Sequence, residues 1–322
     1  ITIIGVGDIM LGSLVPSRNY LPANNDCTPL LEPTTPILKN ADVTFGNFEG
    51  VFTDTKVGAK ECNNPNICFT FGMPSKYINC LVDAGFDVLS IANNHSGDFG
   101  ERGRKNTVRV MEEAGMYHAG LESCPSTTAV KDGIKYGFCA FAPNRNTIQI
   151  TDYDNAQKIV KELDADCDIV IVSFHGGAEG TGRQRITRNY EYFLGENRGN
   201  VYKFARKVID AGADVVFGHG PHVTRAVDMY KNRFIIYSLG NFCTYSKINI
   251  RGVCGIAPIV KVFVDRNGKF LKAKIIPTYQ VKHKPPRIDQ EKKVIKKIQE
   301  LTKQDIPEVE LNINDDGLIT RK

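Results

Sequence analysis

Polar residues of the kinds that bind metal ions follow five short apolar segments of this sequence. These residues are Asp8; Asn47 and Glu49; Asn93, Asn94, His95 and Asp98; His175 and Glu179; and His219 and His222. Four of the six histidines of the chain lie among them. A mixture of carboxylate, amide and imidazole ligands suits Mn²⁺, Fe or Zn²⁺, whereas an oxygen-only cage suits Ca²⁺ or Mg²⁺. The pattern predicts a site for one or two divalent metal ions.

Each of these residues has an ordinary structural interpretation when it is taken alone. Asp8 could cap a helix, Glu49 could be a loop charge, Asn93 and Asn94 could form turns, and a histidine at a strand end could be a hydrogen-bond partner. Taken together they favour a metal site, because several buried carboxylates without a compensating cation would cost several kcal/mol each, on the order of the usual desolvation penalty.

The elements that must position these residues alternate between short β-branched runs and amphipathic stretches. Strands are expected at 2–6, 43–48, 88–92, 134–141, 169–174, 215–217 and 234–237, and helices at 75–84, 101–114, 155–163, 190–211 and 290–302. A hairpin is expected from 259–264 and 270–276 around Asn267-Gly268. This order predicts an α/β fold with some antiparallel pairing, in which polar groups gather at the carboxyl ends of the strands.

Composition and charge exclude several classes of protein. The 322 residues are 42% hydrophobic and 24% charged, which excludes a collagen-like, coiled-coil or largely disordered chain. No apolar run reaches the roughly 18 residues that a membrane-spanning helix needs.

The net charge is +5, but residues 261–303 alone carry +9 (13 Lys/Arg against 4 Asp/Glu), which leaves the rest of the chain at −4. We interpret this basic segment as a solvated strand pair and helix in preference to a surface for an anionic partner, and we expect no nucleic-acid binding because interleaved aromatic residues are lacking.

The cysteines and the first residue of the chain bear on its compartment. Cys80, Cys139 and Cys167 lie in apolar segments and are expected to be buried free thiols. Cys62 and Cys68 bound a turn-rich loop that could close a short disulfide in an oxidising compartment. The chain begins at Ile1 inside an apolar run, without Met or a signal peptide, which suggests that upstream residues were trimmed.

Other catalytic motifs fail on inspection. Gly5-Val-Gly7 resembles the start of a dinucleotide-binding loop, but Met10 occupies the third glycine position. The sequence contains no phosphate-binding Gly-x-x-x-x-Gly-Lys-Ser/Thr loop, no Gly-x-Ser-x-Gly nucleophile turn and no His-Glu-x-x-His helix. Catalysis by a serine or cysteine nucleophile therefore has no support.

The ordered set of motifs resembles the CapA-type capsule (poly-γ-glutamate) biosynthesis family, a branch of the calcineurin-like metallophosphoesterase superfamily. The motifs are Gly7-Asp8-Ile-Met-Leu-Gly12, Asn47-Phe-Glu49, Asn93-Asn-His95 with Asp98 and Gly100, His175-Gly-Gly-x-Glu179, Gly218-His219-x-Pro-His222 and Tyr237-Ser-Leu-Gly-Asn241-Phe242. The resemblance covers about residues 2–245. It implies a four-layer α/β/β/α metallophosphoesterase-like sandwich with mixed sheets. We assign residues 1–285 to the family domain, and the helical spacing of Val294, Ile295, Ile298 and Leu301 predicts that 286–322 form a C-terminal helix and tail packed on it. The resemblance also implies an extracytoplasmic protein that a trimmed N-terminal segment anchors to the bacterial membrane.

The resemblance assigns roles to individual residues. Asp8 matches the first-motif metal aspartate and Glu49 the bridging aspartate; Asn94, His175 and His219 match ligands of the second metal, and His222 matches a ligand of the first. His95 matches the general acid, with Asp98 beside it. Candidate substrate-binding residues are Arg183, Arg185, Glu179 and Asn241, although Arg183, Arg185 and Arg188 could equally form a solvated loop.

Two departures from the family pattern bear on activity. The first motif of the superfamily is Asp-x-His, and its histidine position is Met10 here, so the first metal lacks a ligand. Gly176 and Gly220 replace larger residues and are expected to open the pocket.

Three functions stay open at this point. The first is a metal-dependent hydrolase acting on a phosphoester or on a linkage of an anionic polymer, and the second uses the same Lewis-acid chemistry to cleave or transfer γ-glutamyl amide bonds. The third is a non-catalytic polymer-binding component of a membrane-anchored capsule assembly complex. The expected partners are an anionic polymer or phosphoester substrate and membrane-bound capsule synthesis proteins.

Overall fold

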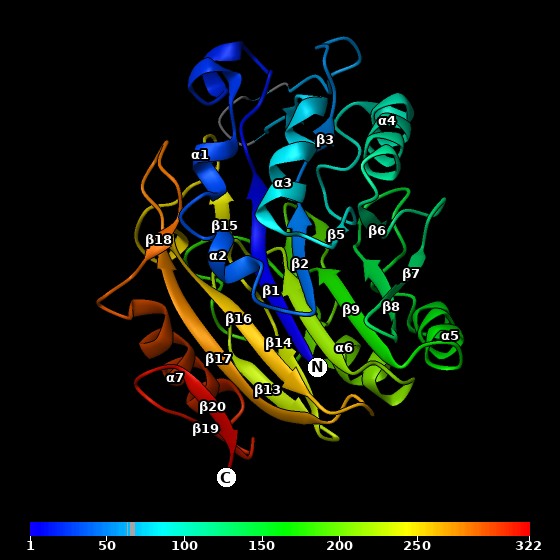
Figure 1. Ribbon diagram of the computed structural model, residues 1–322, viewed down its shortest axis with the longest axis vertical. Helices are drawn as coiled ribbons and strands as arrows, with labels where there is room; N and C mark the ends of the chain where they lie inside the picture. The colour runs from blue at the N-terminus through cyan, green and yellow to red at the C-terminus, as the bar shows by residue number, and fades with distance from the viewer. Residues whose placement is uncertain (63, 65–67) are drawn as a thin grey trace.

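The computed structural model describes residues 1–62, 64 and 68–322. Within these residues the strands form two large mixed sheets (Figure 1). The ten-stranded sheet contains β1 (Thr2–Met10), β2 (Val43–Phe48), β5 (Val88–Ser90), β6 (Tyr117–Ala119), β15 (Asn241–Thr244), β16 (Ile256–Val264), β17 (Phe270–Tyr279), β18 (Arg287–Ile288), β19 (Leu311–Ile313) and β20 (Leu318–Arg321). The six-stranded sheet contains β7 (Ser126–Lys131), β8 (Ile134–Phe141), β9 (Ile169–His175), β12 (Val215–His219), β13 (Val227–Tyr230) and β14 (Arg233–Ile236).

The strands that carry the candidate ligands run parallel within each sheet. In the larger sheet, β1 pairs in parallel with β2 and β15, and β2 pairs in parallel with β5. In the smaller sheet, β9 and β12 are parallel neighbours. Their carboxyl ends therefore meet at one edge of each sheet, which is where ligands bind in open α/β sheets. Two short pairs, β3 (Val51–Phe52) with β4 (Gly72–Met73) and β10 (Tyr192–Phe193) with β11 (Glu196–Asn197), lie in the loops beyond.

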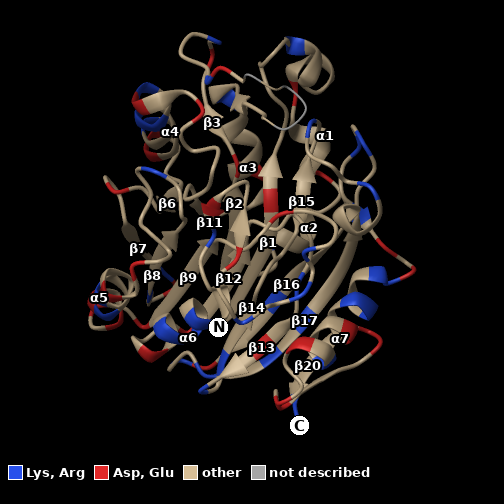
Figure 2. Ribbon diagram, turned by 180° about the vertical axis from the view of Figure 1, so that it is seen from behind, with Lys and Arg blue, Asp and Glu red and all other residues tan. Residues whose placement is uncertain are grey.

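The two sheets pack face to face, and helices cover their outer faces. The rings of Phe45 on β2 and Phe217 on β12 stack with centroids 5.3 Å apart at the centre of the sandwich. Helices α5 (Tyr153–Asp164) and α6 (Val201–Asp210) pack on the smaller sheet, whereas α1 (Thr28–Leu31), α2 (Thr35–Leu38), α3 (Ile78–Ala84) and α4 (Gly100–Glu113) lie on the larger one. Figure 1 shows α1–α3 in front of the strands, and Figure 2, from behind, shows α6 in front. The predicted four-layer sandwich is confirmed.

One predicted helix is wrong over half its length. The sequence pattern predicts a helix at 190–211, but the helix α6 begins at Val201, after the hairpin of β10 and β11. The hairpin turns at Leu194 and Gly195, which have φ of 49° and 82°. Asn200 begins the helix because its side chain accepts a hydrogen bond from the Lys203 amide. The Gly-Asn-rich stretch before it offers turn conformations that compete with a helix.

The C-terminal segment joins the larger sheet. Helix α7 (Lys293–Asp305) packs on β16 and β17 through the buried side chains of Val294, Ile295, Ile298 and Leu301, so the helix expected near 290–302 is confirmed. Strand β20 pairs with β17. Some basic side chains here have local partners: Lys292 pairs with Asp316, and Lys297 pairs with Glu300. Figure 2 shows basic and acidic residues near each other on and around α7.

The described part of the chain contains two disulfides, Cys27–Cys80 and Cys62–Cys68. The second is the one that the turn-rich loop suggests. The expectation that Cys80 is a free thiol is wrong, because α3 brings it against Cys27, 53 positions earlier in the sequence. Cys139 is a buried free thiol, and Cys167 is free but only partly buried. Among the described residues, no helix combines the length and apolar character needed to cross a membrane.

Candidate metal centre

The candidate ligands come together at the ends of the parallel strands. Asp8 is the register partner of both Asn47 on β2 and Asn241 on β15. His175 and His219 end β9 and β12 and are register partners across the smaller sheet. Because the two sheets face each other, carboxylates from one and imidazoles from the other meet in a single buried site.

Asp8 has no exposed surface and forms hydrogen bonds with several other residues of this site. Its Oδ1 accepts hydrogen bonds from Asn47 Nδ2 at 2.9 Å and from His219 Nδ1 at 3.2 Å. Its Oδ2 accepts one from His222 Nδ1 at 2.9 Å. Because the carboxylate only accepts, both histidines donate to it through Nδ1, and in the neutral ring Nε2 is the atom that can bind a metal, which is the arrangement by which a carboxylate orients a metal-binding imidazole.

Several buried polar atoms of the site lack a hydrogen-bond partner among the described residues. These atoms are Glu49 Oε1, Asn94 Oδ1, both ring nitrogens of His175, and His219 Nε2. Glu49 Oε1 lies 3.4 Å from His222 Nε2, and one ligand atom from each of Asp8, Glu49 and His222 falls within 4.8 Å of the others. Buried polar atoms without partners cost free energy, and a cation would provide a partner for the carboxylate and amide oxygens and for one ring nitrogen of each histidine. The residues present therefore fit a divalent metal ion.

The electrostatics of the site reflect its burial. Burial raises the pKa of Glu49 well above its usual range, and the carboxylates of Asp8 and Glu179 add to the rise. Burial also lowers the pKa of His175 well below its usual range, with the nearby Arg198 charge adding to the effect. A neutral imidazole is the form that binds a metal. Burial alone would raise the pKa of Asp8, but hydrogen bonds from His219 and His222 lower it.

His95 and Asp98 form a dyad at the edge of the site. His95 Nδ1 lies 2.7 Å from Asp98 Oδ2, and His95 Nε2 faces Glu49 Oε1 at 3.9 Å. Asp98 also accepts hydrogen bonds from Lys60 Nζ at 2.7 Å and from the Phe71 amide at 2.8 Å. Burial would raise the pKa of Asp98, but His95 and Lys60 lower it below its usual range. The carboxylate thus holds the ring with Nε2 turned toward the candidate ligand Glu49.

The site opens into a cleft of about 580 Å³. Asn94, His95, His222 and Glu179 line it on the side of the candidate ligands. Glu179 Oε2 lies 4.0 Å from His222 Nε2, and Glu179 Oε1 pairs with the buried Arg198 at 2.9 Å. Arg198 also pairs with Glu196 at 2.6 Å, so its charge is held in place beside the cleft.

The predicted arginines lie outside this cleft. Arg185 pairs with the buried Asp305 of α7, and Arg188 pairs with Glu308 at 2.7 Å, so both tie the loop after β9 to the C-terminal segment. Arg183 is exposed, and its carbonyl oxygen accepts a hydrogen bond from Arg225. Asn241 is buried behind His222, whose Nδ1 lies 3.1 Å from Asn241 Oδ1.

The expectation that Gly176 and Gly220 open the pocket is wrong. Both are buried, and a Cβ atom on Gly220 would lie 2.7 Å from the Gly176 carbonyl oxygen. The Gly176 amide donates a hydrogen bond to the His219 carbonyl at 2.8 Å. The two glycines therefore allow the loops after β9 and β12 to pack closely, and neither lines the cleft. Met10 has no exposed surface and belongs to an apolar cluster that includes side chains of α1–α4.

Lys60 and Arg198 contact the site although the sequence predicts no role for them, whereas Asn47 is already among the predicted residues of metal-binding type. Lys60 lies in a loop without periodicity, and Arg198 was placed inside the predicted helix at 190–211. No local signal distinguishes these two from ordinary surface cations.

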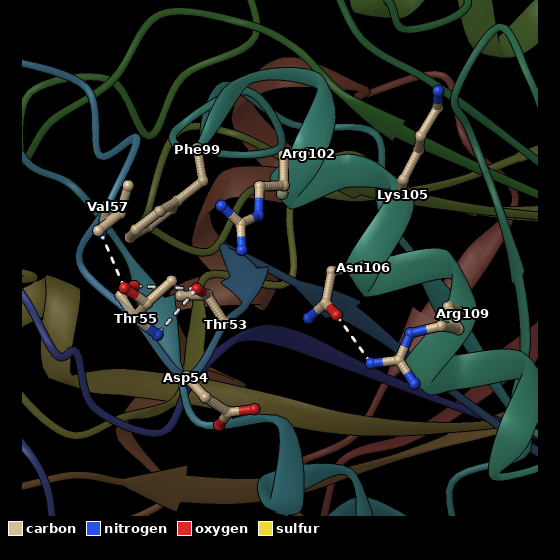
Figure 3. A pocket seen from close by; sticks show the side chains of 10 residues that line it. Thr53, Asp54, Thr55, Val57, Phe99, Arg102, Lys105, Asn106 and Arg109 are labelled. Atoms are coloured by element: carbon tan, nitrogen blue, oxygen red, sulfur yellow. Dashed lines mark hydrogen bonds between the residues drawn. The ribbon is translucent and has the colours of Figure 1, made fainter.

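A second cavity, of about 510 Å³, lies between residues 53–57 and α4 (Figure 3). Of its charged residues, Lys105 pairs with Glu101, Arg109 pairs with Glu113, and Asp54 accepts a hydrogen bond from the Ser75 amide. None of the predicted site residues lines it, so the cleft at the strand ends is the candidate functional site.

The fold and the site define a four-layer α/β/β/α sandwich with a candidate metal centre between its sheets. The model of the bacterial capsule synthesis protein PGA_cap family matches residues 2–246, and the chain belongs to this family. It is 27% identical over 263 residues to the capsule biosynthesis protein CapA of Bacillus anthracis, covering 75% of this chain and 59% of the relative. It is 29% identical over 255 residues to the PGA biosynthesis protein CapA of Bacillus subtilis (strain 168), covering 74% and 61%.

The chain thus spans about three fifths of the length of these relatives. Among solved structures, a hypothetical protein from Thermus thermophilus matches with a TM-score of 0.53 and 13% identity, covering 87% of this chain and all of that one. This likeness shows the fold alone.

Proposed function

We propose that this protein is a metal-dependent hydrolase of capsule (poly-γ-glutamate) biosynthesis, acting on a phosphoester or a γ-glutamyl bond. The observation that carries the proposal is the set of buried, unpartnered ligand atoms on Glu49, Asn94, His175 and His219 around Asp8. Membership of the capsule synthesis family supports the biological role. The two disulfides support an oxidising, extracytoplasmic setting, and we extend the proposal to attachment at the bacterial membrane.

The metal ligands in this proposal are Asp8, Glu49, Asn94, His175, His219 and His222. When bound, a divalent metal supplies Lewis-acid polarisation of the phosphoryl or acyl oxygen. His95 donates a proton from Nε2 to the leaving group, and Asp98 holds the ring in the orientation that this transfer requires. Arg198 keeps Glu179 at the cleft wall, where the carboxylate faces His222.

The test is the metal content of the purified protein, measured by elemental analysis after reconstitution with Mn²⁺, Fe²⁺ or Zn²⁺. We expect one or two equivalents in the wild type and a loss in Asp8→Ala and His175→Ala. His118→Ala is the matched control, because His118 is a buried histidine on β6, away from the site. A protein that takes up no metal would overturn the proposal. A metal-loaded protein should also hydrolyse bis(4-nitrophenyl) phosphate.

A second candidate function rests on Met10. Because this buried residue stands where the superfamily has a metal-binding histidine, the protein could act without catalysis as a polymer-binding part of a capsule assembly complex. Binding to polyglutamate that weakens with salt and survives Asn94→Ala and His175→Ala would favour this function.

A further inference from the structure

The cleft beside the candidate metal centre is lined by apolar as well as polar side chains. Phe69, Phe193, Leu194 and Ile248 line the cleft together with the site residues, and we call these four the apolar rim. They come from three segments that are far apart in the sequence: the loop before β4, the β10–β11 hairpin and the loop after β15. Single exposed apolar residues are common on proteins, but a group that converges on one cleft indicates a binding surface.

The tip of the β10–β11 hairpin presents Leu194 to solvent. Its side chain is 73% exposed, and its backbone has a φ of 49°, an uncommon conformation for a residue with a side chain of this size. The ring of the neighbouring Phe193 packs against the Arg198 guanidinium, which lies 5.5 Å from the ring centroid. The same Arg198 is fixed by Glu179 and Glu196. The hairpin is therefore anchored at its base while its apolar tip stands free at the mouth of the cleft.

A cation lies at this rim without a carboxylate partner. Lys247 Nζ lies 4.7 Å from the ring of Tyr20 and 5.8 Å from the ring of Phe69, and no ion pair to it occurs among residues 1–62, 64 and 68–322. Most cations around the cleft are paired: Lys60 with Asp98, and Arg198 with two glutamates. A ligand that complements this wall combines hydrocarbon surface with negative charge.

We propose that the cleft binds an amphiphilic phosphoester, with its phosphoryl group at the metal centre and an attached alkyl or aryl group against the apolar rim. The inference rests on the proposed function, because the phosphoryl group is assigned to the metal ligands. The rim selects for apolar surface on the substrate, and Lys247 neutralises a further anionic oxygen beside it.

The test is the affinity of the Mn²⁺-treated protein for methyl-, hexyl- and phenylphosphonate, measured by calorimetry. Phosphonates carry a carbon–phosphorus bond that ester hydrolysis does not break, so binding is measured without turnover. Partial burial of five additional methylene groups corresponds to a gain of about tenfold or more in affinity. We therefore expect hexylphosphonate to bind at least about tenfold more tightly than methylphosphonate. Hexyl- and phenylphosphonate have equal carbon numbers, so a stronger gain for one identifies an alkyl chain or an aryl group as the preferred apolar moiety.

Leu194→Ser and Phe193→Ser should each reduce the hexyl-to-methyl ratio to below about threefold. Leu271→Ser is the matched control, because Leu271 is 54% exposed on β17 and does not line the cleft; its ratio should equal that of the wild type. Equal affinity across the series, or an unchanged ratio in both rim variants, would overturn the inference. Absence of ester hydrolysis with an intact affinity series would instead overturn the hydrolase function alone.

Discussion

Arg225 and Glu191 face each other inside the molecule, with two guanidinium nitrogens 2.8 and 2.7 Å from the two carboxylate oxygens. Arg225 has no exposed surface, and Glu191 is 5% exposed. Glu191 also accepts a hydrogen bond from the Ala178 amide, next to Glu179. The pair therefore joins two segments: the loop that contains Glu179 and the segment that follows His222. Because Glu179 lines the cleft, the pair helps to hold the wall of the cleft in place.

Replacing Arg225 with Met should lower the free energy of unfolding by about 3–5 kcal/mol, because Glu191 would stay buried without its counter-charge. The double variant Arg225→Met/Glu191→Met should recover part of this loss. Lys105→Met, which removes an exposed pair with Glu101, should cost less than about 1 kcal/mol. Urea unfolding of the four proteins measures these changes. A single variant Arg225→Met as stable as the wild type would show that the pair is not a structural link.

The two disulfides should contribute unequally to stability. Cys27–Cys80 spans 53 positions and Cys62–Cys68 spans 6. A longer loop restricts the unfolded chain more, so Cys27→Ala/Cys80→Ala should lose about 4 kcal/mol and Cys62→Ala/Cys68→Ala about 2 kcal/mol. Thermal unfolding under oxidising conditions measures both. Cys124→Ala, which removes a free cysteine, is the control, and equal losses in the two double variants would contradict the loop-length argument.

The sequence predicted the parts of the site that local patterns determine. His175 and His219 end apolar strands and Asp8 lies two residues before the end of β1, and parallel pairing then brings these positions together whatever the intervening loops do. Lys60, Arg198 and the Arg225–Glu191 pair could not be predicted, because their partners lie far away in the sequence and a cation in a loop looks the same whether it is paired or solvated. Cys80 was misassigned for the same reason. Its apolar helix predicted burial correctly but carried no information about Cys27.

Asp214 should make the stability of the fold depend on pH. This carboxyl group is 5% exposed, accepts a hydrogen bond from the Val170 amide at 2.7 Å and pairs with Arg233 at 2.9 Å. Burial raises its pKa from 3.8 to about 7. Between these values the folded protein holds a proton that the unfolded chain has lost. The contribution of Asp214 to stability is therefore full below about pH 4 and is lost as the pH rises through 7.

Asp214→Asn does not titrate, so its stability relative to the wild type should rise by up to about 4 kcal/mol between pH 4 and pH 8. Placing an amide beside Arg233 also changes the free energy of unfolding by an amount that does not depend on pH. This amount cancels when the values at pH 4 and pH 8 are compared. Urea unfolding of both proteins at several pH values provides the measurement. Parallel stability profiles would mean that Asp214 is ionised in the fold at neutral pH and that Arg233 compensates its burial.

Replacing His95 with Asn tests the proton transfer that the His95–Asp98 dyad is proposed to perform. A general acid matters most when the departing oxygen is a strong base, because such an oxygen leaves slowly without a proton. In the metal-loaded protein, His95→Asn should reduce kcat for alkyl and phenyl esters by about 100-fold or more, and reduce it much less for 4-nitrophenyl esters. Metal content, measured alongside, should stay at the wild-type value because His95 is not among the proposed ligands. His118→Asn is the control for a buried histidine outside the site and should leave both rates unchanged. An equal reduction for good and poor leaving groups would assign His95 to substrate positioning, and the proton would then have to come from solvent.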